Sequence, residues 1–391
     1  MPFALRSTGC IFEAKLSKIS TRKVHIVSFD VPFPADYGGV IDVFYKVKAL
    51  ADAGIGVILH AFDYGRGSSP LLEKMCERVV YYPRKMHSWL FFHKLPFIVV
   101  SRKNQQLLHH LTEDEHPVLF EGIHTCGYLA EESLAGKNRV VRSHNVEHNY
   151  YHSLSEAEQK IFKRSYLRRE SIKLAHFESI FRHASHLAAI SMHDELYFSG
   201  KGYPVSLVSA FHPHQKVSTK SGKGSFALYH GNLGVAENDK AACYLIEEVF
   251  SGLDVPLCIA GNHPSKRLRQ LAAAHPHIRL SYNVSTEHIH HLIEEAQLNI
   301  LPTFQPTGIK LKLLSALYSG RHCIVNTPMV KETGLEQFCH IADQPGGMQA
   351  LVKKWFDIPF GTDALDFRKG IEHGRFSNEH NAEKLMQLLF R

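Results

Sequence analysis

The sequence lacks any apolar run long enough to cross a membrane. A spanning helix needs roughly 18 or more consecutive apolar residues, and no stretch of the 391 residues approaches that length. It also lacks a Cys-x-x-Cys pair, and its 7 cysteines are an odd number, which argues against a disulfide framework or a zinc site. Reduced cysteines are typical of the cytoplasm, so we expect a cytoplasmic protein whose membrane contact, if any, is peripheral and at the inner face.

Signals for nucleic acid and metal are equally scarce. No lysine-rich run or aromatic-interleaved basic stripe is present, which argues against nucleic acid as a partner. The 45 Lys and Arg against 38 Asp and Glu leave a formal charge of +7, which suits an anionic small ligand or a weak contact with an anionic membrane. Among the 28 histidines are pairs such as His290-His291, but helix neighbours point in different directions and bind a metal poorly together. We expect no metal.

The length of the chain and one segment rich in Pro and Gly predict two domains. A chain of 391 residues exceeds what one core usually organises, so two units of roughly 150 to 200 residues are expected. Residues 1–22 have neither a continuous apolar core nor a clear cleavage site and are interpreted as an N-terminal tail. Residues 212–224, rich in Pro, Ser, Lys and Gly, are interpreted as a linker between a first domain at 23–211 and a second at 225–391.

Apolar runs alternate with helical patterns along both predicted domains. The expected strands lie within 24–29, 56–62, 79–82, 118–122, 139–145, 187–191 and 205–208, then within 226–233, 256–262, 278–280, 298–301 and 323–325; the strands in 226–233 and 256–262 end in glycine. Residues 156–184 are expected to be helical and charge-rich. The alternation predicts an α/β protein with a doubly wound sheet in each domain, which binds its ligands at the carboxyl ends of the strands.

Residues 302–320 carry the strongest ligand signal. Pro306 and Gly308 break the chain after a short strand, and an apolar periodicity then predicts a helix. The first backbone N–H groups of such a helix bind phosphate, and Lys310 and Lys312 add two cations. An ordinary helix with solvated lysines is the alternative.

Residues 307–325 resemble the donor-binding loop and helix of retaining GT-B glycosyltransferases, specifically the family 4-like branch. That branch commonly reads Gly-x-x-x-Lys-x-Leu-Glu-Ala-x-x-x-Gly before a Val-Val strand, and the resemblance extends more loosely from residue 23 onward. It implies two Rossmann-like domains facing a central cleft, a nucleotide-sugar donor, retention of anomeric configuration, and no metal or other cofactor. The family's two glutamates, which contact the sugar and the ribose, correspond to Thr307 and Ser315, so both carboxylates are missing at these donor-binding positions.

The resemblance also implies roles for polar residues of the first domain. Gly38-Gly39 stand where the family places a Gly-Gly loop that lines the cleft, although alone they could be a plain loop pair. Asp36 and Tyr37 beside them are expected on the acceptor side. His144 follows a strand that the family ends in Arg-x-His-Asn, with the histidine against the donor sugar; a structural histidine that caps the strand is the alternative.

Three further features are expected to contribute to the binding of substrates. Glu147, on the polar loop after His144, either reaches the acceptor or is a solvated carboxylate. Gly231-Asn232 follow a second-domain strand where the family often carries a diphosphate-clamping Gly-Arg, and asparagine hydrogen-bonds phosphate without charge. The aromatic stretch 89–102, flanked by cations such as Lys85 and Lys94, either fills the first core or, if exposed, docks a lipid-linked acceptor.

These features predict a glycosyltransferase that moves a hexose-like sugar from a nucleotide sugar to a glycan or lipid-linked saccharide, in cell-surface polysaccharide synthesis. The catalytic candidates are His144, Lys310 and Lys312. Two alternatives stay open: a nucleotide-sugar-binding protein without turnover, because both family glutamates are absent, and a nucleotide-sugar epimerase of the same architecture.

Overall fold

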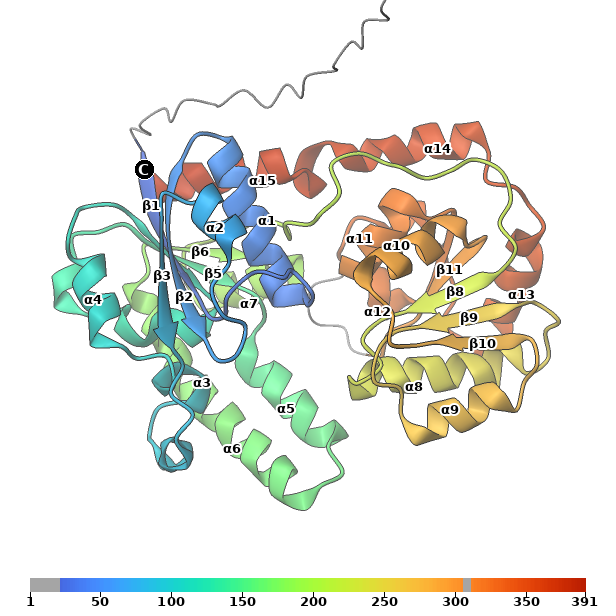
Figure 1. Cartoon of the computed structure of the whole chain (residues 1–391), viewed down its shortest axis with the longest axis horizontal. Coiled ribbons are helices and arrows are strands. Elements are labelled where there is room, and N and C mark those ends of the chain that lie inside the picture. The colour runs from blue at the N-terminus through green and yellow to red at the C-terminus, as the bar shows by residue number, and fades with distance from the viewer. Residues whose placement is uncertain (1–21, 305–310) are drawn as a thin grey trace, which may run out of the picture.

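Two parallel sheets with helices packed against them make up the protein (Figure 1). The computed structural model describes residues 22–304 and 311–391, so Thr307, Gly308 and Lys310 lie outside the described residues. The strand order is β3-β2-β1-β4-β5-β6-β7 in the first sheet and β10-β9-β8-β11-β12-β13 in the second, and the paired strands run parallel. The predicted α/β class with two Rossmann-like sheets is confirmed.

The first sheet follows the β-branched runs of the sequence. Its strands are β1 (Lys23–Ser28), β2 (Gly56–Asp63), β3 (Arg78–Pro83), β4 (Val118–Glu121), β5 (Arg139–Ser143), β6 (His186–Ala189) and β7 (Val205–Leu207). Its helices are α1 (Gly38–Asp52), α2 (Pro70–Met75), α3 (Phe97–Val100), α4 (Gln105–Leu111), α5 (Glu147–Ala157), α6 (Ile161–Phe177) and α7 (Met192–Gly200), with the short 3₁₀ turns η1 (Ser88–Phe92), η2 (Ile123–Tyr128), η3 (Glu132–Leu134) and η4 (Glu178–His183). Val24, Ile26 and Val27 of β1 are all buried, as expected for a parallel strand covered on both faces.

The second sheet is smaller. Its strands are β8 (Ala227–His230), β9 (Leu257–Ala260), β10 (Ile278–Ser281), β11 (Leu298–Leu301), β12 (His322–Val325) and β13 (His340–Ile341). Its helices are α8 (Ala236–Tyr244), which continues into the π-turn η5 (Leu245–Phe250), then α9 (Lys266–Ala273), α10 (Thr286–Glu295), α11 (Leu311–Ser319), α12 (Thr327–Val330), α13 (Pro345–Phe356) and α14 (Thr362–Arg368). The turns η6 (Glu336–Phe338), η7 (Lys369–Glu372) and η8 (Gly374–Phe376) lead to α15 (Asn378–Leu389).

One predicted helix is divided. The chain forms α5 and α6 with a break at 158–160 in place of a continuous helix from residue 156, and α6 ends at Phe177. At the break, Glu158 Oε1 accepts a hydrogen bond from the backbone N–H of Lys160 at 3.0 Å. Such a local side-chain bond competes with the helical backbone bonds, and charge periodicity alone does not reveal it.

Both sheets reverse their strand order at one point. The strands β2 and β3 add on one side of β1, and β4 to β7 add on the other; β8 and β11 flank the corresponding point of the second sheet. In doubly wound sheets the loops diverge at such a reversal point, and ligands bind there.

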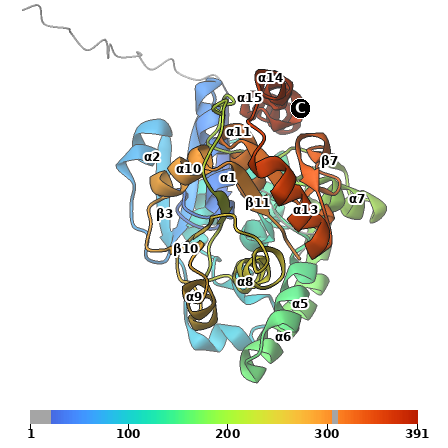
Figure 2. The same cartoon turned by 90° about the vertical axis from the view of Figure 1, so that its right-hand side faces the viewer.

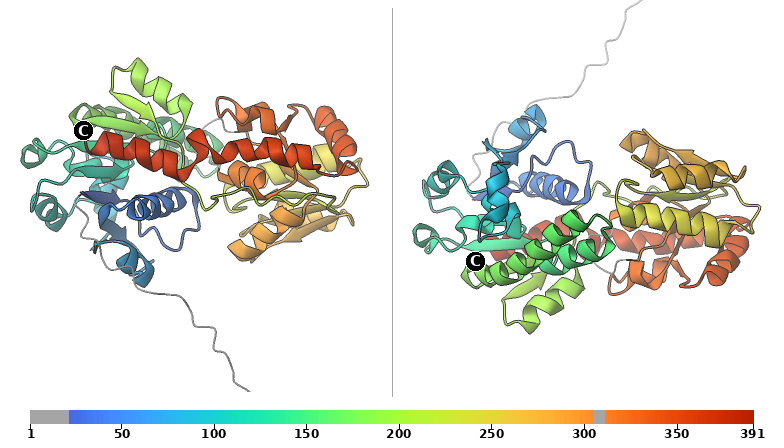
Figure 3. Two further views of the ribbon diagram at one scale, coloured as in Figure 1. Left: turned by 90° about the horizontal axis from the view of Figure 1, so that it is seen from above. Right: turned by 90° about the horizontal axis from the view of Figure 1, so that it is seen from below.

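Helix α15 returns to the first sheet after the whole second sheet (Figures 1 and 3). Leu385, Leu388 and Leu389 of α15 belong to the apolar core that contains Val43 and Val47 of α1. Residues 225–391 are predicted to be one domain, and the packing of α15 does not follow that division. Periodicity shows that a helix has an apolar face but not which sheet the face covers.

The chain crosses between the units twice, at the linker and again just before α15, and the two crossings lie side by side. The backbone N–H of His212 donates to Asn378 Oδ1 at 3.1 Å, and Asn378 Nδ2 donates to the carbonyl oxygen of His212 at 2.7 Å. The two crossings are therefore held together by hydrogen bonds.

Within residues 22–304 and 311–391, no helix combines the length and the apolar composition that crossing a membrane requires.

Candidate functional site

A buried ionic network lies at the reversal point of the first sheet. Asp42 and Lys46 are one turn apart on α1, Glu121 ends β4, and Arg142 belongs to β5; all four side chains are fully buried. The Nζ of Lys46 lies 2.8 Å from Asp42 Oδ2 and 2.7 Å from Glu121 Oε1. The Nη2 of Arg142 lies 2.9 Å from Asp42 Oδ1. The network fixes the first half of α1 against the ends of β4 and β5.

The charges of this network balance one another within the protein. Burial alone would raise the pKa of Asp42, but Arg142 and Lys46 outweigh it and hold that pKa below the ordinary carboxyl value. Burial also opposes ionisation of Glu121, and Lys46 and His144 lower its pKa. Asp42, Glu121 and His144 are close enough to share an ion, but two cations already neutralise the two carboxylates, and a third would be repelled.

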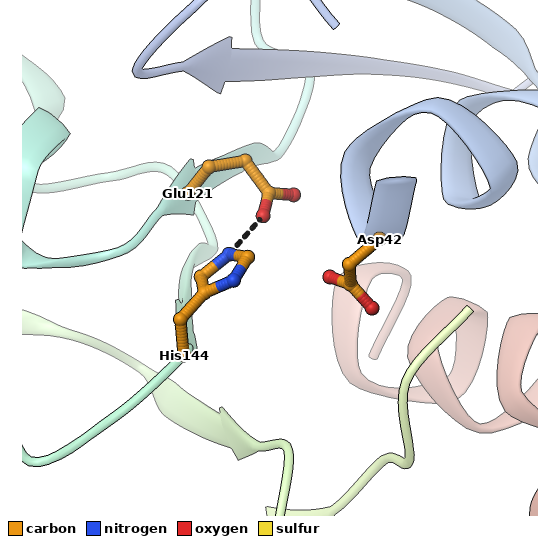
Figure 4. A group of neighbouring side chains, drawn as sticks. All are labelled: Asp42, Glu121 and His144. Atoms are coloured by element: carbon orange, nitrogen blue, oxygen red, sulfur yellow. Dashed lines mark hydrogen bonds and ion pairs between the residues drawn. The ribbon is translucent and has the colours of Figure 1, made fainter. Parts of the chain in front are cut away.

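His144 joins the network through one ring nitrogen. Figure 4 shows its imidazole beside Glu121, with Nε2 2.9 Å from Glu121 Oε2. Because a carboxylate only accepts, Nε2 carries a proton, and in the tautomer protonated at Nε2 the other nitrogen, Nδ1, is an acceptor. Nδ1 is buried and has no hydrogen-bond partner within the part of the chain that the structure describes. The predicted strand-end histidine is therefore held by one nitrogen with the other unused.

The glycine pair opens α1 and faces the second unit. A Cβ on Gly39 would lie 2.7 Å from Phe29 Cζ, which is closer than real contacts allow, and a Cβ on Gly38 would lie 3.9 Å from Leu311 Cδ1. Leu311 begins α11 of the second unit. The starts of α1 and α11 therefore approach each other across the two sheets.

Asp36 and Tyr37, predicted on the acceptor side, lie on the loop before α1. The Tyr37 hydroxyl donates to Asp30 Oδ2 at 2.6 Å, and burial followed by Asp30 raises the pKa of this phenol. Asp36 Oδ1 lies 2.9 Å from Arg66 Nη2. Both side chains are oriented by partners in their own unit, and their contact with an acceptor stays a prediction.

Glu147 is not a solvated carboxylate, which was one of the two alternatives that the sequence left open. It lies in the first turn of α5 and is 7% exposed. Burial raises its pKa to about 7, an Asn145 hydrogen bond opposes the rise, and the charge of Asp194 adds to it. After burial, the charges of Glu147 and of Glu237 both raise the pKa of Tyr150. Since Glu237 belongs to α8, the phenol of Tyr150 is influenced by a carboxylate of each unit.

Lys312 of α11 contacts the first turn of α8. Its Nζ lies 3.1 Å from Asn238 Oδ1, and the amide of Asn238 donates to the carbonyl oxygen of Asn232 at 3.0 Å. A Cβ on Gly231 would lie 3.3 Å from Asn238 Cγ, so glycine permits this close packing. The structure brings Lys312, Gly231 and Asn232 together, although sequence reasoning missed Asn238, which joins them.

A neutral histidine lies beside this lysine. His230 ends β8 and is 6% exposed; burial and then the charge of Lys312 lower its pKa to about 3. Near the loop after β11, Glu237 accepts a hydrogen bond from the Thr303 hydroxyl. Asn326 fixes that loop by accepting from the Thr303 N–H at 3.0 Å and donating to its carbonyl oxygen at 2.7 Å.

Ser315, at the second missing glutamate position, faces the linker. Its Oγ lies 3.0 Å from His214 Nε2, and the His214 ring stacks on Tyr318 with centroids 5.3 Å apart. Contact of Ser315 with a donor stays a prediction, as do the roles of Thr307, Gly308 and Lys310, which lie outside the described residues.

A small pocket of about 80 Å³ lies between the units. Its lining includes Ser191, His193 and Ser209 of the first unit and Leu314, Glu332 and Arg375 of the second. Sequence reasoning missed these residues, and also Glu121 and Glu237, because no local motif marks them: their positions follow from contacts between segments far apart in the chain.

Part of the chain is similar to a known family. The family model described as glycosyl transferases group 1 matches residues 225–352, the segment that holds Gly231, Asn238 and Lys312. A Klebsiella pneumoniae protein, described as an uncharacterized 44.6 kDa protein in the cps region, is 26% identical over 312 residues, which is 75% of this chain and 80% of that protein.

Solved structures agree with the whole architecture. The crystal structure of TarM covers 95% of this chain and 99% of its own, with a TM-score of 0.65 at 10% identity. An Arabidopsis thaliana protein complexed with UDP-L-rhamnose covers 94% of this chain and 98% of its own, with a TM-score of 0.54 at 9% identity. Such low identities establish the fold alone, and that fold is the predicted GT-B type.

Proposed function

We infer, from a GT-B fold whose second sheet matches the glycosyl transferases group 1, that this protein transfers a sugar from a nucleotide-sugar donor to a saccharide acceptor. The acceptor is a glycan or a lipid-linked saccharide, and the sugar is hexose-like. The family 4-like pattern at residues 308–320 supports a retaining reaction.

The approach of α1 to α11 carries this proposal. A doubly wound sheet binds its ligand at the reversal point of its strands, and the helix that starts at Gly38 faces the helix that starts at Leu311. A donor held by the second sheet therefore presents its sugar to residues at the end of the first. This is the geometry that transfer between two bound substrates needs.

The donor diphosphate fits beside Lys312. The ammonium group donates to Asn238 of α8, whose amide holds the loop that contains Gly231 and Asn232. In the sequence, Thr307, Gly308 and Lys310 precede the same helix as Lys312. Leaving-group charge grows on the diphosphate as the glycosidic bond breaks, and cations and N–H groups fixed beforehand stabilise it. Because Asn232 replaces the family arginine, Lys312 carries more of this task.

The transferred sugar fits against His144. Its unused Nδ1 accepts a hydrogen bond from a sugar hydroxyl, while Glu121 holds the ring in the required tautomer. Glu147, with a pKa of about 7, is suited to accept a proton from an acceptor hydroxyl near neutral pH. These roles need no metal, and the neutral network around Asp42 disfavours one.

The Klebsiella relative suggests a cellular setting. Its description places it in a cps region, a name for genes of capsular polysaccharide. We propose a role in cell-surface polysaccharide synthesis, at the cytoplasmic side where nucleotide sugars are made.

Binding without turnover is the second candidate. Thr307 and Ser315 replace both family glutamates, and the Ser315 hydroxyl already bonds to His214.

A thermal-shift screen of nucleotides and nucleotide sugars identifies the donor, because a selective ligand stabilises only the folded protein. Incubation of the selected donor with saccharide acceptors then separates the candidates: transfer supports the enzyme, binding with an intact donor supports the binding protein, and a changed sugar without an acceptor indicates the epimerase. Transfer that persists in excess chelator supports metal independence.

A further inference from the structure

An exposed surface with aromatic and basic side chains lies on the first unit, apart from the candidate site. It consists of η1 with its flanking residues and the outer side of α6, and we refer to it as the η1–α6 surface. Trp89 is 62% exposed, Phe92 75% and Phe162 93%. The sequence left open whether the aromatic stretch fills the core: Leu90 and Phe97 do so, whereas Trp89 and Phe92 do not.

The two parts form one continuous surface. The Phe91 and Tyr166 rings meet edge to face with centroids 5.4 Å apart, the Arg169 guanidinium lies 5.8 Å from the centre of the Phe92 ring, and Lys173 Nζ donates to the carbonyl oxygen of Phe91 at 3.0 Å. On a helix, positions four apart share a face, so Phe162 continues the row of Tyr166 toward the start of α6. Figures 1 and 2 show α5 and α6 protruding at the lower end of the first unit.

The charge of this surface is almost entirely positive. Five residues of α6 are Lys or Arg and one is Glu; of the five, Lys163 is paired at 2.6 Å with Glu158, which precedes the helix. That acid, Glu170, is fully buried, where Oε2 accepts from the Phe97 N–H at 2.6 Å and Oε1 binds Lys173 at 2.6 Å. The flanking segment 84–94 contains three Lys or Arg and no acid.

A shallow hollow lies within the basic part. Its volume is about 210 Å³, and its lining includes Lys94, Lys173, Ser179 and Arg182. Three cations and a hydroxyl around a space of this size fit a phosphate group. The hollow adjoins the aromatic segment, because Lys173, which lines the hollow, also donates to the carbonyl oxygen of Phe91.

We propose that the η1–α6 surface docks on a bilayer rich in anionic phospholipid, with Trp89, Phe92 and Phe162 in the interfacial layer and a lipid phosphate in the hollow. Trp and Phe insert at the polar boundary of a bilayer, and clustered cations are attracted to anionic headgroups. A surface nearly free of acids matches such a bilayer better than a protein partner of mixed charge. Docking does not depend on the proposed sugar transfer, but together they would place a lipid-linked acceptor beside α5, which begins at Glu147.

Vesicle co-sedimentation of the full chain tests the proposal. Vesicles of phosphatidylcholine with roughly 30% phosphatidylglycerol should sediment the protein at roughly 50 mM salt, and binding should be lost near 0.5 M salt because screening shortens the reach of the charges. Vesicles of phosphatidylcholine alone should bind it on the order of tenfold more weakly.

Exposed substitutions give matched variants. The pair Phe92→Ser and Phe162→Ser should reduce partitioning on the order of tenfold or more, whereas Leu196→Ser with Phe367→Ser, at exposed apolar sites elsewhere, should leave it unchanged. Arg168→Glu should weaken binding about tenfold, and Lys353→Glu on α13 should not.

Absence of sedimentation at low salt would overturn the proposal, as would equal sedimentation of the η1–α6 and control variants. Concentration-dependent dimers that the Phe92→Ser and Phe162→Ser pair abolishes, without vesicle binding, would assign the surface to a second copy of the chain. Nucleotide binding in the thermal-shift screen is measured without vesicles, so docking and the proposed function fail separately.

Discussion

The Nε2 of His144 lies 2.9 Å from Oε2 of Glu121, and the other ring nitrogen, Nδ1, has no partner within the described residues. Adjacent strands fix this pair, because β4 and β5 are parallel and Glu121 stands opposite Arg142 in their register. The same carboxylate binds Lys46. A histidine oriented in this way is prepared to accept a hydrogen bond from a ligand.

Replacement of His144 tests that role. His144→Ala should lower the rate of sugar transfer by about two orders of magnitude, because a contact that strengthens as charge develops is lost. Nucleotide affinity, which the second sheet provides, should change little. Kinetics with the donor from the screen measures both, and His109→Ala, at an exposed histidine, is the control. Transfer at the wild-type rate would remove His144 from the site.

Lys312→Ala should weaken nucleoside-diphosphate binding by about 1.5 to 3 kcal/mol, the contribution of a charged hydrogen bond. Calorimetry with the diphosphate measures the loss, and Lys353→Ala on α13 should bind like the wild type. If the affinity of Lys312→Ala for the corresponding nucleoside falls equally, the lysine acts on the loop around Asn238 and not on the phosphates.

Asp42→Asn should destabilise the first unit. Arg142 and Lys46 would lose one of the two carboxylates that neutralise them in a fully buried position, and breaking such a pair costs about 3 to 5 kcal/mol. Urea unfolding followed by circular dichroism measures the change. Asp52→Asn, which removes an exposed ion pair with Lys48 on the same helix, should cost less than about 1 kcal/mol; similar losses in both variants would contradict the assigned importance of the network.

The buried histidines predict loss of stability in mild acid. Burial, then His212, lowers the pKa of His214 to about 3, and burial, then Lys312, lowers that of His230 to about 3. The unfolded chain therefore binds protons below about pH 6.5 that the folded protein does not bind. The stabilising contribution is complete above pH 6.5 and is lost as the pH falls toward 3, by roughly 1.4 kcal/mol per pH unit for each histidine.

Urea titrations at several pH values measure this slope. Between pH 6 and 4, His214→Gln should lower the slope of the unfolding free energy against pH by about 1.4 kcal/mol per pH unit, the contribution of one proton. His109→Gln, at an exposed position, should not alter the slope. An unchanged slope in His214→Gln would show that His214 titrates alike in the folded and unfolded chains.

Leu385→Ala should reduce the free energy of unfolding by about 2 to 5 kcal/mol, since the side chain is fully buried and its removal leaves a cavity. Because this leucine packs with α1 and not with the second sheet, diphosphate affinity should be unchanged. Met386→Ala, a half-buried neighbour on the same helix, should cost less. A Leu385→Ala protein that unfolds like the wild type would contradict the packing.

The sequence predicted most strands because each is a short β-branched run that ends in polar or glycine residues. It also predicted that His144 and Gly231 lie at strand ends, since a parallel sheet presents its carboxyl ends on one edge. The predictions that failed concern elements whose position depends on contact with another segment. The apolar period of α15 was visible, but its sheet was not.

The surroundings of two predicted site residues, Ser315 and Glu147, were not predicted for the same physical reason. Ser315 bonds to His214, which is 101 residues away, and Glu147 is buried although it stands in a polar stretch of sequence. Local composition describes how a residue prefers to be solvated, whereas the contacts that finally solvate or desolvate it come from distant parts of the chain.

The return of α15 has a consequence for how the protein is synthesised. The core around α1 needs Leu385, Leu388 and Leu389, which the ribosome adds only after every strand of the second sheet. The first sheet therefore emerges earlier but completes its core later, and its α1 face stays uncovered during that interval. The second sheet, though made later, gathers its own strands β8 to β13 without waiting for α15. Chaperone contact during translation is accordingly expected at the α1 face of the first sheet.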